Sequence, residues 1–197
     1  MIKYVLTDEI KAYPGRTLHR IKCVTAFSNV KAGEPGGWVE SENNLSQSGD
    51  AWVYDNAKVY GNAKVYDNAK VYGNAKVFGD AQVYDNAKVF GNAEVYGDAK
   101  VYDNAWVYGN AEVYGNADVY DNAVVKETSD YAVYKNTWSS RRYFTWTRSN
   151  NMWKVGWFYG SGEELIAKAY KDSKLSGDCY KAFVKLREKL NKLEKMK

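Results

Sequence analysis

Residues 51–122 consist of twelve consecutive copies of one six-residue phrase: AWVYDN, AKVYGN, AKVYDN, AKVYGN, AKVFGD, AQVYDN, AKVFGN, AEVYGD, AKVYDN, AWVYGN, AEVYGN and ADVYDN. A hexapeptide period is typical of a parallel β-helix, in which each phrase forms one short strand and one corner. Ala and Val lie two positions apart, so both point inwards, while the residue between them and the following aromatic residue point outwards. Gly-Asn and Asp-Asn suit the corner, because these residues adopt left-handed backbone angles at low cost.

A second, longer period indicates how many phrases complete one turn. The corner residue is Asp at four positions spaced by 18, with Gly at the corners between them; these are Asp67, Asp85, Asp103 and Asp121. Three phrases therefore form one coil, and twelve phrases form four coils stacked at roughly 4.8 Å. This predicts an all-β solenoid with a triangular cross-section over residues 51–128, filled by Ala and Val.

The segments on either side of the repeats have other patterns. Residues 1–50 are expected to form a β-rich cap and irregular first coils, which cover unpaired strand edges at one end of the prism. Residues 129–197 are expected to form an α+β module. It would hold a β-hairpin from Arg142 to Tyr159, a helix opened by the capping box Ser161–Glu164, and a last helix over about 178–195. Apolar residues at four-three-four-three spacing in that last helix predict a seam that packs on the hairpin rather than on another copy: Cys179, Phe183, Leu186, Leu190 and Leu193.

Composition excludes several classes of protein. Cys23 and Cys179 have no zinc-ligand spacing, which argues against a disulfide scaffold or structural zinc and favours a reducing, cytoplasmic setting. The N-terminus lacks the apolar core of a signal peptide, and nowhere do about 18 apolar residues run together, so no membrane partner is expected. Residues 51–122 carry a net charge of −4 and residues 123–197 one of +8. The basic part permits contact with an anionic partner, although a solvated surface explains it as well.

Two resemblances carry the interpretation further. The repeats resemble the left-handed parallel β-helix, or hexapeptide-repeat, superfamily, whose best-known members are trimeric acyltransferases. The N-terminal block resembles small phage- and prophage-encoded hexapeptide-repeat proteins, often labelled only as transferases or polymer-forming proteins, at Leu18, Arg20-Ile21, Val30–Gly33, Gly36–Glu42 and Asn44–Ser46. A tail module of that phage group is similar at Ser140-Arg141, Thr145, Gly156–Phe158, Gly160 and Glu163-Glu164. The resemblance implies a left-handed coil, a phage origin and the cytoplasm of an infected or lysogenic bacterial host.

The sequence argues against an enzyme. Acyltransferases of the superfamily use a base, usually a His on a coil or on a loop that leaves the prism. This chain has one His, His19, before the repeats, and no loop interrupts the twelve phrases. No catalytic residue, cofactor or metal site is therefore predicted. The column of Asp corners could bridge cations such as Ca²⁺, but hydrogen bonds from nearby backbone N–H groups are the favoured explanation for Asp there.

Aromatic columns form the first candidate binding site. Each of the three outer faces carries four Tyr or Phe residues above one another. The first face is the candidate, and it holds Trp52, Tyr54, Tyr72, Phe90, Trp106 and Tyr108. The rings have two interpretations: a ladder that stabilises the sheet, or an amphipathic surface that binds a partner. The preferred specific use is side-by-side association of three prisms, with a dimer as the other homo-oligomer.

The predicted hairpin forms the second candidate site. Its basic and aromatic residues alternate, which would let them grip single-stranded nucleic acid by stacking and charge: Arg141, Arg142, Phe144, Trp146, Arg148, Trp153 and Lys154. The favoured alternative is a hydrophobic hairpin face that the two helices cover.

Three functions remain open at this point. The first is a non-enzymatic, phage-derived interaction protein that binds and inhibits or redirects a host macromolecule, a candidate anti-defence protein whose partner is a host protein. The second is a nucleic-acid-binding or nucleic-acid-mimicking protein, and the third is a degenerate acyltransferase relative.

Overall fold

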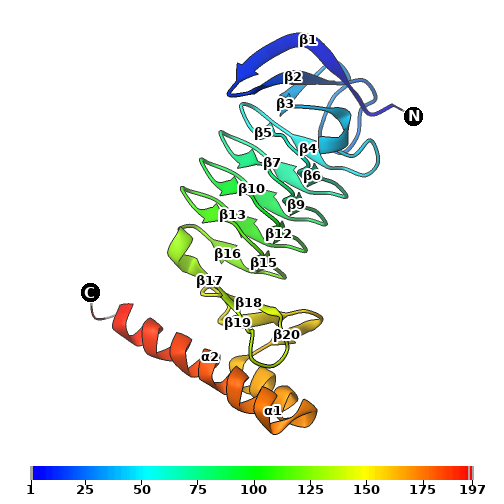
Figure 1. Ribbon diagram of the computed structural model, residues 1–197. Coiled ribbons are helices and arrows are strands. Elements are labelled where there is room, and N and C mark those ends of the chain that lie inside the picture. Colours follow the sequence, from blue (N-terminus) through cyan, green and yellow to red (C-terminus); the bar gives the residue numbers. More distant parts are fainter. Residues whose placement is uncertain (1, 195, 197) are drawn as a thin grey trace. The chain divides into compact units, whose positions relative to one another are not determined.

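The computed structural model describes residues 2–194 and 196 of the 197-residue chain, in two compact units (Figure 1). The first unit, Met1–Asp130, holds the N-terminal segment and the repeats, and the second, Tyr131–Lys197, holds the C-terminal module. The segments predicted at 1–50 and 51–128 thus lie in one unit.

Short strands dominate the first unit. They are β1 (Tyr4–Tyr13), β2 (Arg16–Cys23), β3 (Pro35–Val39), β4 (Trp52–Val53), β5 (Lys58–Val59), β6 (Lys64–Val65), β7 (Lys70–Val71), β8 (Lys76–Val77), β9 (Gln82–Val83), β10 (Lys88–Val89), β11 (Glu94–Val95), β12 (Lys100–Val101), β13 (Trp106–Val107), β14 (Glu112–Val113), β15 (Asp118–Val119) and β16 (Val124–Val125), with the 3-10 helices η1 (Glu42–Asn44) and η2 (Thr128–Asp130).

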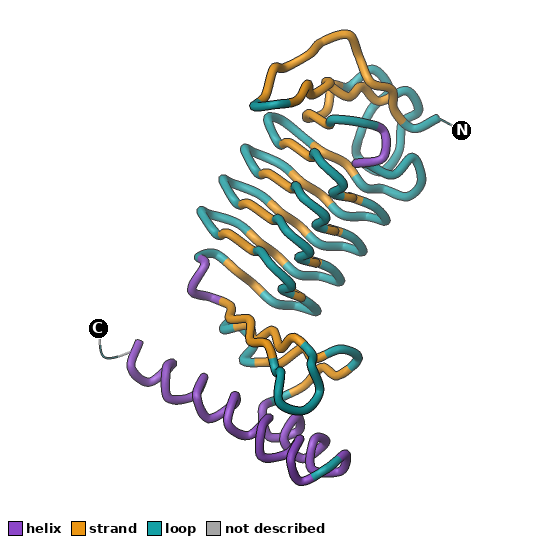
Figure 2. Tube along the Cα trace, viewed as in Figure 1, coloured by secondary structure: helices purple, strands orange, loops and turns teal. Residues whose placement is uncertain are grey.

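The repeats form a parallel β-solenoid. Each phrase contributes one short strand, which pairs in parallel with the equivalent strands of the coils before and after it; Val89, for example, pairs with Val71 and Val107. The strands stack into three sheets, β3-β5-β8-β11-β14, β4-β7-β10-β13-β16 and β6-β9-β12-β15, and Figure 2 shows them alternating with turns along the coil. Three strands per turn confirm the predicted period of three phrases, while the left-handed sense and triangular section stay predictions.

The interior of the solenoid is built from the two inward positions of the phrase. Every Ala and Val of the twelve repeats is fully buried. Backbone N–H groups of each coil donate to carbonyl groups of the next, as Lys88 N does to Ala105 O at 2.9 Å, so the stack satisfies its own polar groups.

The corners adopt the left-handed conformation that their residue types predict. The Asp corners have φ between 51° and 58°, from Asp55 to Asp121, and the Gly corners of the repeats between 65° and 71°. Gly is needed where coils approach closely: a Cβ on Gly97 would lie 3.0 Å from the backbone N of Gly115.

The N-terminal segment covers the first coil. β1 and β2 pair antiparallel, β2 pairs antiparallel with β3, and β3 pairs in parallel with β5, which extends one solenoid sheet. The nearly buried Lys3 ammonium donates to the carbonyl oxygens of Ser48, Gly49 and Ala51 at 3.4, 3.3 and 2.9 Å. Its burial lowers the pKa of Lys3 to about 8.

The second unit is a four-stranded antiparallel sheet followed by two helices. Its elements are β17 (Tyr131–Lys135), β18 (Tyr143–Thr147), β19 (Met152–Val155), β20 (Phe158–Gly160), α1 (Gly162–Asp172) and α2 (Lys174–Glu194). The predicted hairpin is therefore only part of the sheet. Its second arm is broken at Gly156, whose φ of 57° turns the chain between β19 and β20, and β17 adds a strand beside β18. The predicted capping box is confirmed, because Ser161 Oγ accepts from Glu164 N and the Glu164 carboxylate from Ser161 N.

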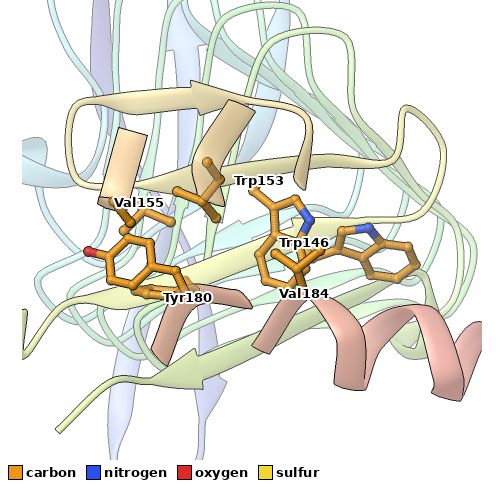
Figure 3. Packing of buried hydrophobic residues seen from close by; sticks show 8 residues of the cluster. Trp146, Trp153, Val155, Tyr180 and Val184 are labelled. Atoms are coloured by element: carbon orange, nitrogen blue, oxygen red, sulfur yellow. The ribbon is translucent and has the colours of Figure 1, made fainter. Parts of the chain in front are cut away.

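Both helices pack on one face of this sheet. The core joins Trp146, Trp153 and Val155 from the strands to Tyr180 and Val184 of α2 (Figure 3). The residues that α2 buries are Gly177, Tyr180, Val184 and Arg187. The predicted seam is different: Cys179 and Phe183 pack only partly on the core, and Leu186 and Leu193 are 45% and 51% exposed. The prediction that this seam packs on the hairpin is therefore wrong for its C-terminal half. No helix that the structure describes is long and apolar enough to span a membrane.

Candidate binding surfaces

The Asp corners are explained by hydrogen bonds within the solenoid. The carboxylate of Asp55 accepts from Gly73 N at 3.1 Å, and that of Asp85 accepts from Asp103 N at 3.3 Å, in each case one coil further on. Neighbouring Asn side chains form a parallel ladder, as between Asn74 and Asn92 at 3.2 Å. Among the described residues, no group of three or more His, Cys, Asp or Glu is arranged to hold a metal ion. The favoured structural explanation for these corners therefore has direct support.

The aromatic columns are stacked ladders. Tyr72 lies 4.7 Å from Phe90, and Phe90 lies 4.8 Å from Tyr108, with interplanar angles of 3°. The other two columns have 4.7–5.3 Å between successive ring centroids and near-parallel rings, except that Tyr102 and Tyr120 are tilted by 42°. In these stacked pairs the ring faces contact one another and mainly edges and hydroxyl groups remain for a partner, which supports the ladder interpretation. Tyr54 differs, because its ring meets that of Tyr72 edge-on, at 6.5 Å and 88°.

Column 3, defined here as Tyr66, Tyr84, Tyr102 and Tyr120, lies next to Asp side chains of the corners and of the outer face. Burial, with the charges of nearby Asp residues, raises the pKa of Tyr84 and Tyr102 far above its ordinary value. The phenols of Tyr84 and Tyr102 therefore stay neutral at higher pH than free tyrosine does.

Trp52 does not belong to an exposed site. It is fully buried, because Tyr4 and Phe27 of the N-terminal segment pack against it at centroid distances of 6.1 and 5.5 Å. Trp106, at the equivalent place in a later coil, is 42% exposed and has the Lys88 ammonium 4.8 Å from its ring centre. The predicted six-residue site is thus reduced to the ladder and one exposed Trp.

The predicted basic and aromatic hairpin surface does not exist as a surface. Phe144, Trp146 and Trp153 are buried, because α1 and α2 cover this face of the sheet (Figure 3). The basic residues are dispersed: Arg148 forms an ion pair with Glu194 at 2.6 Å, Lys154 is half-buried, and Arg141 and Arg142 are exposed. The favoured alternative, a covered hydrophobic face, is the observed one.

The structure adds a surface that the sequence did not reveal, here called the Trp157 surface: Arg142, Trp157, Phe158, Lys168 and Asp172. These residues line a pocket of about 250 Å³ whose floor is apolar, formed by Val155, Leu165, Ala169 and Tyr180. Trp157 follows Gly156 in the β19–β20 turn and is 97% exposed. Within the described chain neither Arg142 nor Lys168 forms an ion pair; the Lys168 ammonium lies 5.5 Å from the Phe158 ring centre. The Gly-Trp pair in a turn was the signal available in the sequence.

His19 lies in β2 with Nδ1 3.4 Å from the carbonyl oxygen of Thr7, a backbone contact. It pairs across the sheet with Ile10 and Val39, so its position is that of a strand residue in the N-terminal segment.

Comparison with known proteins identifies the repeat. A family model described as the YdcK β-solenoid repeat matches residues 81–97. A protein of Escherichia coli (strain K12) named "Uncharacterized acetyltransferase YdcK" is 35% identical over an alignment of 63 residues that covers 28% of this chain and 19% of that protein. The chain thus spans less than a fifth of that relative's length. Together with the hexapeptide period and the three parallel sheets, these matches are consistent with the hexapeptide-repeat β-helix superfamily.

Proposed function

We propose that this chain is a non-enzymatic interaction protein that binds a host macromolecule, a protein, through the Trp157 surface. The observation that carries the proposal is the 97% exposure of Trp157 beside a pocket with an apolar floor and two cations that form no ion pair within the described chain. Exposed Trp is enriched at protein interfaces, where its large ring anchors a partner. By contrast, the aromatic rings of the repeats are engaged with one another.

The chemistry of the pocket indicates the kind of partner. Val155, Leu165 and Ala169 accommodate an apolar side chain, and Arg142 and Lys168 at the rim attract a carboxylate next to it. The whole second unit contains fifteen Lys and Arg against six Asp and Glu, a net charge of +9, whereas the first unit carries −5. An acidic segment of a host protein with one apolar anchor fits this surface best.

A phage origin and an inhibitory or redirecting role complete the proposal. Their support is the resemblance of the N-terminal block and the tail module to phage- and prophage-encoded proteins, which suggests action in the cytoplasm of the bacterial host. The name of the E. coli relative favours an acetyltransferase instead. However, the family match covers residues 81–97, a stretch of Ala, Val and ladder residues that builds the scaffold. A retained acyltransferase site would bind acetyl-CoA, so a higher melting temperature with millimolar acetyl-CoA would contradict the proposal.

The decisive experiment compares three immobilised variants in host lysate. Trp157→Ala and Arg142→Glu should lose the specific partner, while Trp106→Ala should keep it. Trp106 is the matched control, since it is a partly exposed Trp next to a Lys in the first unit. Retention of the partner by Trp157→Ala, or its loss in Trp106→Ala, would refute the Trp157 surface as the binding site.

Single-stranded nucleic acid is a second candidate for the same surface. Both faces of the Trp157 ring are open to a base, and Arg141, Arg142 and Lys168 are available for phosphates. A labelled oligonucleotide that binds at low salt, weakens steeply with salt and is released by Trp157→Ala would favour this candidate over a protein partner. No binding at low salt would eliminate it.

A further inference from the structure

Helix α2 carries two apolar faces, and only one of them is largely buried within the second unit. The face turned to the sheet holds Gly177, Tyr180, Val184 and Arg187. The other, here called the α2 stripe, holds Cys179, Phe183, Leu186, Leu190 and Leu193. At 100° per residue the two faces lie roughly 120° apart around the helix. The face with Tyr180 and Val184 already packs on the sheet, so this packing does not explain why Leu186, Leu190 and Leu193 of the stripe are apolar.

The α2 stripe is only partly covered in the second unit, because Cys179 and Phe183 pack on the edge of the core and the Phe183 ring lies 5.0 Å from that of Phe144. Leu186 and Leu193 are 45% and 51% exposed, and an apolar groove runs beside Cys179, Phe183 and Leu186, with the 68% exposed Trp138 as one wall. α1 cannot fill it, because α1 packs elsewhere on α2: Tyr170 lies against Gly177, and Val184 lies against Gly162.

We propose that the α2 stripe binds the α2 stripe of a second copy of this chain in a parallel, two-stranded coiled coil. The four-three-four-three spacing keeps a stripe facing one partner helix, with Cys179, Leu186 and Leu193 at d and Phe183 and Leu190 at a. Because every copy carries the same stripe, a two-fold axis along the helices makes the contact self-complementary.

Charge and packing select the parallel pair over other arrangements. In parallel register Lys189, at g, lies opposite Glu194 of the second copy, at e, which is attractive. Glu194 is already held in place by Arg148 and Arg187 at 2.6 and 2.9 Å. In the antiparallel register centred on Leu186, the two copies of Arg187 would instead approach each other. A third helix has no room, since Tyr180 and Arg187 on the e side are buried in their own unit.

The stripe is short, so the association should be weak. It offers about two heptads, which bury less than the roughly 1,200 Å² of a standard interface, and we expect a micromolar dissociation constant. This inference is independent of the Trp157 surface, which uses other residues, and each can fail alone.

Sedimentation of the full chain under reducing conditions tests the interface. Wild type should show a monomer–dimer equilibrium in the micromolar range, and Leu186→Lys should raise the dissociation constant at least tenfold. Leu186 is half exposed in the monomer, so the variant should fold normally, which circular dichroism checks. Ile10→Lys, at a 60% exposed apolar residue of β1, is the matched control and should leave the equilibrium unchanged.

Oxidative cross-linking tests the parallel register. Cys179 lies two turns away from Leu186, so the two copies of Cys179 face each other in the parallel pair but not in an antiparallel pair centred on Leu186. Mild oxidation should therefore join two chains through Cys179, and Cys179→Ser should abolish the product. Cys23 is buried and should not contribute. A chain that stays monomeric, a dimer that survives Leu186→Lys, or a Leu186→Cys/Cys179→Ser variant that cross-links while wild type does not would each overturn the proposal.

Discussion

Tyr84 and Tyr102 should limit the stability of the solenoid at alkaline pH. Burial, with nearby Asp charges, raises the pKa of both phenols well above 10 in the folded chain, while the unfolded chain titrates near 10. The folded state therefore holds these protons more tightly. The resulting stability is fully present below pH 10 and is lost as pH rises from the unfolded pKa towards the folded one.

The magnitude follows from linkage. Each phenol that stays protonated in the folded state but ionises in the unfolded state lowers the free energy of unfolding. The decrease is about 1.36 kcal/mol per pH unit above 10, or about 2 kcal/mol at pH 11.5. The edges of the rings reach solvent, which screens the effect, so we expect about half of this value, roughly 2 kcal/mol for the pair.

The assay is denaturant unfolding of wild type and Tyr84→Phe/Tyr102→Phe at pH 8 and pH 11.5, followed by circular dichroism. At pH 8 the variant should lie within about 1 kcal/mol of wild type, because Phe78 and Phe90 already occupy equivalent ladder positions. At pH 11.5 it should be more stable than wild type by about 2 kcal/mol. An equal loss of stability in both proteins between the two pH values would refute the reasoning.

Three further substitutions test the scaffold by chemical denaturation. Val95→Ala should cost about 2–3 kcal/mol, since it removes two buried methyl groups and leaves a cavity, and a cost below about 0.5 kcal/mol would contradict a filled interior. Gly97→Ala should lower the free energy of unfolding by about 2 kcal/mol or more, because the left-handed conformation costs Ala about 1–2 kcal/mol and its Cβ would lie 3.0 Å from Gly115 N. Asp103→Ala should lower it by less, because the corner at φ 56° already accommodates a Cβ. Lys3→Met should cost about 2 kcal/mol, because three carbonyl groups of the first coil lose their donor; a Met variant as stable as wild type would show that water replaces the ammonium.

The solenoid could be predicted because the same six-residue pattern of inward, outward and corner positions occurs twelve times in the sequence. The Ala and Val positions define the inner face, and Gly or Asp defines the corner, so pairing between successive coils follows without any information from distant parts of the chain. Asp85 and Asp103 have positive φ, so the Asp corners adopt the same left-handed backbone conformation as the Gly corners.

Burial at the ends of the columns could not be predicted in this way. Trp52 and Trp106 occupy the same place in the same phrase, yet one is fully buried and the other 42% exposed. The difference comes from Tyr4 and Phe27, which reach Trp52 from the N-terminal segment, far outside its own phrase. The pattern of the repeat therefore could not predict this contact.

In the second unit, too, local sequence patterns did not determine which faces are buried. The spacing of Arg142, Phe144, Trp146 and Arg148 predicted that all four share one face of the hairpin, but it left open whether the helices cover that face. The seam of helix α2 differs from the expectation in its C-terminal half, because Tyr180 and Val184 pack on the sheet while Leu186 and Leu193 stay exposed. Heptad spacing predicted an apolar stripe on this helix, but it did not determine whether the stripe packs on the sheet or on another chain.

A regular solenoid is a poor place for a unique binding site, and the second unit supplies what the repeats lack. Each outer face of the repeats presents the same ladder edge on every coil, so a partner could bind in several equivalent registers. Specific recognition needs a feature that occurs once, and Trp157 with Arg142 and Lys168 is such a feature. The charges act in the same direction: an acidic partner is attracted by the unit of +9 and repelled by the unit of −5, so the first unit directs it to the second. If the second copy also binds through the α2 stripe, each dimer would present two Trp157 surfaces, and a partner with two acidic segments would be held far more tightly than one segment alone.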